Sequence, residues 1–384
     1  MNLLRYLTPL GRSVLLLGLA ALGMARWLNW QEFTQLAVVA LSLLVMGFVW
    51  QVVPGTPSAA LVLRRNRLVE GSAPPVATLE VRAGAVPMLF PKLTVPVGGR
   101  SVSLRLPFLA PFAQHSQSLP LPAMPRGVYV VGPATYEKAD PVGLVSRRFE
   151  VGSTVELLVA PRVTDLSVFA GGLTNDLDGA SSQQRSMSDL AFHALREYVP
   201  GDDLRHVHWR SSAKAGQLLV RQYHETRRGH VTVLVDDAAA SYPRSRDFEL
   251  AVSVAASIAL RAVRDDFDTY LRCGSQVGRG RSATAMTDAA CRFDRSSDGD
   301  DYLARAAAAA ESVTGTGLVV QVTGSAREIV ELDSAASRFD RGADWIVIRA
   351  DSRTEPLLRD SRSLREISVP DLARLQELLA RGMR

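Results

Sequence analysis

The first 53 residues contain two long apolar runs separated by a short polar connection. Residues 13–25 consist mainly of Leu, Ala and Gly, and neither this run nor the second, residues 33–53, contains a charge. A helix needs roughly 20 apolar residues to cross a bilayer, so the pattern predicts a transmembrane helical hairpin. Arg5 and Arg12, ahead of the short first run, also fit a cleavable signal peptide. Whether the first run is a retained span or a cleaved signal stays open.

Basic residues lie on the two outer sides of this hairpin, whereas Arg26 near its connection is balanced by Glu32. The outer set is Arg5, Arg12, Arg64, Arg65 and Arg67. Because positive residues favour the cytoplasmic side, we expect an inner-membrane protein with two spans and with both termini and the large domains in the cytoplasm.

The middle of the chain has short apolar stretches punctuated by Pro and Gly, with alternation in residues 101–106. The stretches are residues 77–81, 93–97, 102–106, 127–131 and 155–159. Turn signals at this spacing predict a small antiparallel, sandwich-like domain. Within it, Arg126-Gly127-Val128-Tyr129 is typical of a strand entry and Asp140-Pro141-Val142-Gly143-Leu144 of a tight turn.

After residue 230, strand and helix patterns alternate. Strands are predicted at residues 231–235, 269–273, 318–323 and 345–349, and helices at 247–265, 301–313, 327–338 and 371–381. Alternation of this kind predicts a doubly wound α/β domain with a parallel sheet, whose ligands lie beyond the carboxyl ends of the strands. Asp236 lies at such an end. Residues 278–281 look like a polar linker.

These patterns divide the chain into four parts. They are a helical hairpin at 1–56, a β-rich sandwich-like domain at 57–170, a linker with a charged motif at 171–229, and the α/β domain at 230–384. A short helix is expected at 190–198, ended by Pro200-Gly201.

The charge composition limits the classes of partner that we expect. The net charge is +5 and the pI about 9.4, but 39 acidic residues are interspersed with 44 basic ones. This mixture is typical of a solvated surface, so we expect no nucleic-acid partner. Two cysteines, Cys273 and Cys291, form no disulfide framework and suit a reducing compartment.

The motif between Arg196 and Arg221 combines arginines, a paired Asp202-Asp203, Trp209 and Lys214. His206 and His208 would share one face of an extended segment, so a metal-dependent hydrolase that uses Asp202, Asp203, His206 and His208 is one alternative. Phosphate or anionic-lipid binding is another, through the basic residues Arg196, Arg205, Arg210, Lys214 and Arg221. The chain contains neither a Gly-Lys-Ser/Thr phosphate loop nor a Gly-x-Ser-x-Gly elbow.

This motif closely resembles the signature of domain-of-unknown-function family fifty-eight. The residues that carry the resemblance, and that we expect to form a partner surface or an interdomain contact, are Arg196, Tyr198, Gly201, Asp202, Arg205, Trp209, Ser212, Lys214 and Arg221. The resemblance implies a membrane-anchored protein with a β-rich segment and a C-terminal domain similar to von Willebrand factor type A. It also implies a role beside a MoxR-type AAA+ ATPase, and it carries over no catalytic residue.

The type A domain holds Mg²⁺ with an Asp-x-Ser-x-Ser sequence, from which this chain departs. Counting from Asp236 or from Asp237 leaves only Ser241 among the hydroxyl positions, so Asp236 and Ser241 are weak metal candidates. We therefore expect a non-enzymatic membrane scaffold or interaction protein without a cofactor, whose oligomeric state the sequence leaves open.

Overall fold

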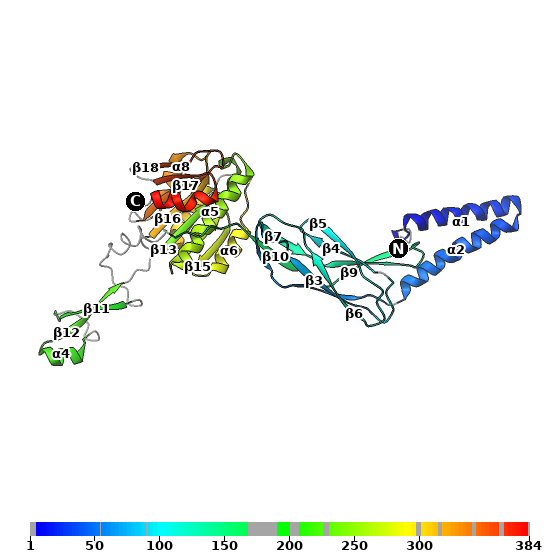
Figure 1. The fold of residues 1–384 in the computed structure, drawn as a ribbon, viewed down its shortest axis with the longest axis horizontal. Helices are drawn as coiled ribbons and strands as arrows, with labels where there is room; N and C mark the ends of the chain where they lie inside the picture. The colour runs from blue at the N-terminus through cyan, green and yellow to red at the C-terminus, as the bar shows by residue number, and fades with distance from the viewer. Residues whose placement is uncertain are drawn as a thin grey trace. The chain divides into compact units, whose positions relative to one another are not determined.

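The computed structural model describes residues 5–53, 55–89, 91–167, 190–199, 207–225, 230–296, 301–313, 317–339, 343–360 and 365–382 (Figure 1). Contacts divide the chain into two units, Met1–Ala160 and Pro161–Arg384.

The first unit begins with two antiparallel helices, α1 (Pro9–Leu28) and α2 (Gln31–Val52). Both are long and apolar enough to cross a membrane, which confirms the predicted pair of apolar helices. The Thr8 hydroxyl caps α1 by accepting a hydrogen bond of 3.0 Å from the Gly11 amide. Gly18 lets the helices approach, because a Cβ there would lie 3.2 Å from the Cβ of Ala40.

The turn predicted at Asp140–Leu144 is present, and it also fastens the hairpin to the β-rich part of this unit. The Asp140 carboxylate accepts hydrogen bonds from the amides of Val142 (3.1 Å) and Val145 (2.6 Å). Helix α1 passes so close that a Cβ on Gly11 would lie 2.0 Å from the Leu144 carbonyl oxygen. A buried cluster completes the joint, formed by Leu7, Leu44, Leu144 and Val145.

Lys138 and Gln51 bind the end of α2 to the same turn. The Lys138 ammonium donates to the Val53 carbonyl at 2.6 Å, where a cation complements the negative end of the helix dipole. The Gln51 amide donates in return to the carbonyls of Lys138 (3.2 Å) and Val145 (3.1 Å). Burial, followed by the charge of Arg147, lowers the pKa of Lys138.

In the described part of the first unit, ten strands follow the hairpin. They are β1 (Ser58–Leu63), β2 (Arg67–Val69), β3 (Val76–Arg82), β4 (Lys92–Val97), β5 (Arg100–Arg105), β6 (Gln114–Pro120), β7 (Gly127–Val131), β8 (Ala134–Ala139), β9 (Ser146–Val151) and β10 (Val155–Ala160). One sheet has the order β1-β3-β6 and the other β2-β10-β7-β4-β8-β9, with β5 paired to β4. A single buried core takes Leu79 and Leu119 from the first sheet and Leu93 and Leu157 from the second, so the predicted β-rich region is confirmed.

The second unit contains an α/β region. Its elements are β13 (His230–Val235), η3 (Ala239–Ser241), α5 (Ser245–Arg264), β14 (Asp268–Cys273), β15 (Gln276–Gly280), α6 (Ala283–Cys291), α7 (Tyr302–Ser312), β16 (Gly317–Gly324), α8 (Ile329–Ala336), β17 (Asp344–Ala350), β18 (Leu357–Asp360), β19 (Arg365–Val369), η4 (Leu372–Arg374) and α9 (Leu375–Gly382). The strand order is β15-β14-β13-β16-β17-β19-β18. The inner five strands are parallel, and the edge strands β15 and β18 pair antiparallel.

Helices cover both faces of this sheet, as the alternating pattern predicts. Val231, Val233 and Val235 pack in the core with α5, α6 and α9, whereas Leu234 packs with α7 and α8 on the other face. Residues 164–167, which the sequence pattern placed at the end of the β-rich domain, belong to this unit. Leu166 is buried in its core, and the Thr164 amide donates to the Ser257 hydroxyl at 3.0 Å.

Two local predictions are wrong. Residues 190–197 form a strand, β11 (Leu190–Glu197), and not a helix, because they pair with β12 (Leu219–Glu225) along their length. Such pairing overrides a weak helix propensity. Residues 278–281 are not a free linker, because Gly278 and Arg279 pair with Leu271 and Tyr270 as part of β15.

Candidate functional site

The α/β sheet reverses its winding between β13 and β16, which are hydrogen-bonded neighbours. The chain continues from β13 to β14 on one side and later returns to β16 on the other. In open α/β sheets, ligands bind at the carboxyl ends of the strands beside such a switch point. Asp236 follows β13 here and Thr323 lies near the end of β16, so the predicted position of Asp236 at a strand end is confirmed.

Arg327 neutralises Asp236 through two parallel hydrogen bonds. Its Nε donates to Asp236 Oδ2 and its Nη2 to Oδ1, both at 2.9 Å. The carboxylate also accepts from the Thr323 hydroxyl at 2.7 Å and from the Ala238 amide at 3.0 Å. The Asp236 side chain is fully buried and that of Arg327 is 4% exposed, so this is a buried, bidentate ion pair of the strong kind.

Neighbouring groups hold the guanidinium in place. Arg349 Nη1 donates to the Arg327 carbonyl at 2.7 Å, which fixes the backbone before α8. Arg327 also donates to Glu331 at 2.8 Å, and its guanidinium lies 4.9 Å from the centre of the Tyr302 ring. Burial raises the pKa of Tyr242 well above its ordinary value, so the phenol stays protonated and donates to the Asp236 carbonyl at 2.6 Å.

Other carboxylates near this edge of the sheet are also paired with arginines. Arg305 pairs with Asp237, which is also buried. Arg244 bridges Asp247 (3.0 Å) and Asp351 (2.9 Å). Three arginines therefore occupy the edge of the sheet at which a doubly wound domain would bind a ligand.

This arrangement does not fit a metal ion at Asp236 and Ser241. A carboxylate offers about four lone pairs, and the Asp236 carboxylate already accepts four hydrogen bonds. Ser241 is buried in the short helix η3. A divalent cation would have to displace Arg327, whose charge already balances the aspartate. Within the described ranges, no group of three or more His, Cys, Asp and Glu side chains is placed to hold a metal.

The second candidate region is the signature segment, in which a short helix, α4 (Trp209–Ala215), connects β11 to β12. His208 caps this helix, because its Nδ1 accepts from the Ser211 amide at 3.2 Å. Ser212 is buried and bonds on two sides, donating to the His208 carbonyl at 3.1 Å and accepting from the Leu219 amide at 2.8 Å. Gly216 ends the helix with a positive φ of 71°.

This framework presents Trp209 to solvent, with 63% of the residue exposed. Arg210 and Lys214 are exposed too and stand four residues apart on one helical face. Two like charges at this spacing destabilise a short helix slightly. Large aromatic side chains are normally buried. Helix α4, held in place by the hydrogen bonds of His208 and Ser212, instead exposes one aromatic side chain and two cations.

The structure assigns different roles to the predicted motif residues that it describes. His208 and Ser212 support the helix, Trp209 and Lys214 face solvent, and the Tyr198 amide bonds the Leu218 carbonyl at 2.9 Å. The backbones of Arg196 and Arg221 lie on the paired strands β11 and β12. Gly201, Asp202, Asp203, Arg205 and His206 lie outside the described residues, and the hydrolase and phosphate-binding alternatives stay predictions.

Comparison with known proteins connects the signature to a family. A family model described as "Protein of unknown function DUF58" matches residues 194–271, which supports the resemblance of the motif. No curated protein matches the chain.

Matching solved structures include the CARDB domain of PF1109 from Pyrococcus furiosus, in a solution NMR structure and in a crystal structure with di-metal ions. The identities are 10% and 11% over 27% of this chain, covering 94% and 93% of those chains, with TM-scores of 0.20 and 0.21. Values this low do not bear on the function of this chain.

Proposed function

We propose that this chain is a membrane-anchored interaction protein that docks a MoxR-type AAA+ ATPase through its Trp209 segment. The observation that carries the proposal is the 63% exposure of Trp209 on a braced helix inside the family-matched region. The partner follows from the family resemblance. The apolar hairpin would hold the protein in the inner membrane, with both termini and the large domains in the cytoplasm.

The chemistry of the segment defines the partner's surface. Trp and Arg are enriched among residues that dominate binding energies. Arg210 and Lys214 would contact carboxylates, and such contacts would offset their mutual repulsion on α4. The surface expected on the ATPase is therefore an apolar pocket with an acidic rim.

We further propose that the C-terminal domain is von Willebrand factor A-like, with Arg327 in the place of the metal. The doubly wound sheet and the aspartate after its first strand support this assignment. Partner binding by such a domain would be independent of divalent cations.

The test is binding of the full chain, in detergent or nanodiscs, to the purified ATPase with and without nucleotide. We expect Trp209→Ala to weaken binding about 30-fold or more, since truncating a hot spot costs about 2 kcal/mol or more. Removing both cations, in Arg210→Ala with Lys214→Ala, should reduce the salt dependence of binding.

Val330→Ala is the matched control, because Val330 is 68% exposed on α8 of the same unit. Binding that is equal in the Trp209, Val330 and unmodified proteins would refute the docking role. Release of the protein from membranes by alkaline carbonate would refute the anchor.

A further inference from the structure

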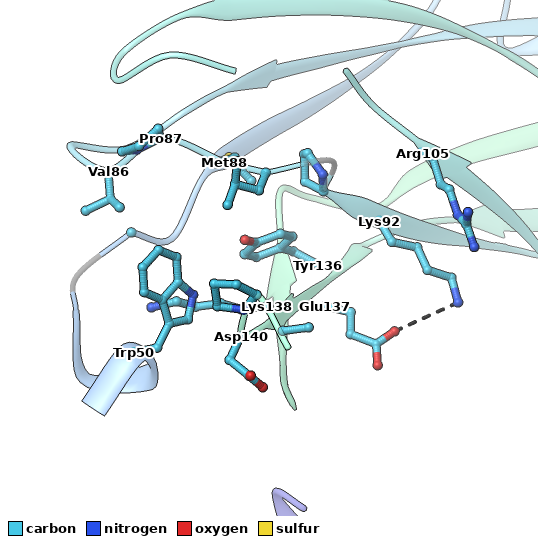
Figure 2. A pocket seen from close by; sticks show the side chains of 15 residues that line it. Trp50, Val86, Pro87, Met88, Lys92, Arg105, Tyr136, Glu137, Lys138 and Asp140 are labelled. Carbon is cyan, nitrogen blue, oxygen red and sulfur yellow. Dashed lines mark ion pairs between the residues drawn. The ribbon is translucent and has the colours of Figure 1, made fainter. Parts of the chain in front are cut away.

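A pocket of about 460 Å³ lies in the first unit beside the end of α2 (Figure 2). Trp50, in the last turn of α2, lines one end together with Val86 and Pro87, whereas Lys92, Arg105 and Glu137 stand at the other. If α2 spans the membrane, as the proposed function requires, Trp50 marks the level of the lipid headgroups, where tryptophan is enriched.

Four charged residues form a row across neighbouring strands, and three of them, Lys92, Arg105 and Glu137, line the polar end of this pocket. Lys92 of β4 is the registered partner of Arg105 on β5 and of Glu137 on β8, and Glu137 is the partner of Arg148 on β9. Registered partners share one face of a sheet. The row therefore sets three cations beside one carboxylate.

The ion pairs inside the row are long. Lys92 and Arg148 each approach Glu137 at 3.9 Å, and their side chains are 47% and 75% exposed. Lys92 and Arg105 are like charges directly opposite one another, an arrangement that destabilises a sheet by itself. An anion held between them would remove this repulsion.

The other charges of the pocket are already engaged. Lys138 donates to the Val53 carbonyl, and Asp140 accepts from two backbone amides. The opposite charges of Lys138 and Asp140 also cancel, so the net positive charge that the pocket offers a ligand comes from the row.

An apolar rim stands beside the chain that leaves α2. Leu89, Phe108 and Phe112 are 54%, 51% and 62% exposed. Two hydrogen bonds between Met88 and Leu109 (2.8 and 3.0 Å) join the two loops that carry the rim. A Cβ on Gly84, in the first loop, would lie 3.2 Å from the carbonyl oxygen of Thr56, just after α2. Exposed apolar side chains next to a membrane helix can enter the interfacial layer.

We propose that this pocket binds the headgroup of an anionic phospholipid. Its phosphodiester lies between Lys92 and Arg105, and its glycerol and upper acyl chains lie over Trp50 and the apolar rim. The inference rests on membrane insertion of the hairpin, and it is independent of partner docking at Trp209.

The experiment is native mass spectrometry of the full chain in mild detergent, titrated with phosphatidylglycerol or phosphatidylcholine. We expect saturable retention of phosphatidylglycerol in preference to phosphatidylcholine. The double variant Lys92→Ala, Arg105→Ala should bind it about 30-fold more weakly, since each cation near anionic lipid contributes a factor of roughly five. Glu137→Gln, which removes the carboxylate of the row, should bind more tightly.

Arg100→Ala is the matched control, because Arg100 is exposed at the far end of the same strand as Arg105. It should retain lipid as the unmodified protein does, and Arg105→Gln gives a milder test if the double variant folds poorly. Equal retention by the double variant and the control would overturn the site. Competition by soluble glycerol phosphate at the same concentrations would overturn the lipid assignment, because the shared phosphate alone would then suffice. A failure here with intact docking at Trp209 would leave the proposed partner function standing.

Discussion

The ion pair between Arg327 and Asp236 makes the sharpest prediction, because both side chains are buried and each depends on the other. Arg327→Ala would leave a carboxylate without its counter-charge at a fully buried position. Removing one partner of a buried pair costs about 3–5 kcal/mol. We therefore expect a free energy of unfolding lower by about 3–5 kcal/mol, which lowers the urea midpoint in proportion. In a unit of this size the same loss corresponds to a fall of about 6–20 °C in melting temperature.

The two cysteines provide an assay specific for the α/β unit. Cys273 and Cys291 are each 2% exposed, and they are the whole cysteine content of the chain. Their reaction with a thiol reagent at increasing urea concentration therefore reports unfolding of this unit within the full-length membrane protein. Arg381→Ala removes an exposed pair with Glu377 as the control, and it should cost less than about 1 kcal/mol.

A second variant separates the charge effect from lost packing. Asp236→Asn in the Arg327→Ala background removes the uncompensated charge, so the double variant should be more stable than the sum of the single effects by about 0.5–3 kcal/mol. A loss no larger than that of Arg381→Ala would refute the buried pair. A Mg²⁺-dependent rise in the urea midpoint of the unmodified protein would refute the proposal that Arg327 stands in the place of a metal.

Two further predictions test the hairpin joint and the first strand of the α/β sheet. Gly11→Ala should weaken the joint by about 1–3 kcal/mol, because its Cβ would lie 2.0 Å from the Leu144 carbonyl oxygen. Faster hydrogen exchange at the Val145 amide would report this, and Gly23→Ala, which meets no atom within 4 Å, should leave exchange unchanged. Burial lowers the pKa of His230, and the negative charge of Asp268 raises it by a smaller amount. The imidazole therefore takes up a proton more readily in the unfolded chain than in the folded one. Stability should rise with pH between the lowered pKa and about 6.5 and be lost on acidification. His230→Gln should therefore lose less stability than the unmodified protein between about pH 7.5 and about pH 5.5 in the thiol assay, and equal losses would exclude this cause.

Structural features that depend only on residues close together in the sequence can be predicted from it. The two apolar runs fix α1 and α2 because a helix of that length and composition needs no partner to be recognised. The Asp-Pro-x-Gly turn at residues 140–143 contains its own acceptor and its own residue for a positive φ. Asp236 follows a buried strand, and this position alone puts it at the ligand edge of the sheet.

Features that depend on distant residues are not predictable in this way. Arg327 lies 91 residues from Asp236, so the sequence around the aspartate does not predict which residue pairs with it. The missing hydroxyls after Asp236 argue against a metal site there, but they do not identify the cation that pairs with this aspartate. Likewise, β11 and β15 become strands only because β12 and β14 supply their hydrogen bonds.

The closed edge of the sheet bears directly on where a partner would bind. A metal ion at a switch point can leave one coordination position for a carboxylate from outside. A guanidinium has five N–H donors and no such position. Arg327 directs two of its donors to Asp236 and one to Glu331 from a nearly fully buried position. An incoming acidic group would have to break this network before gaining any contact. The proposed partner would therefore bind at lower cost on a surface that is already exposed. Among the described residues of the family-matched region, the Trp209 helix, with Arg210 and Lys214, offers such a surface.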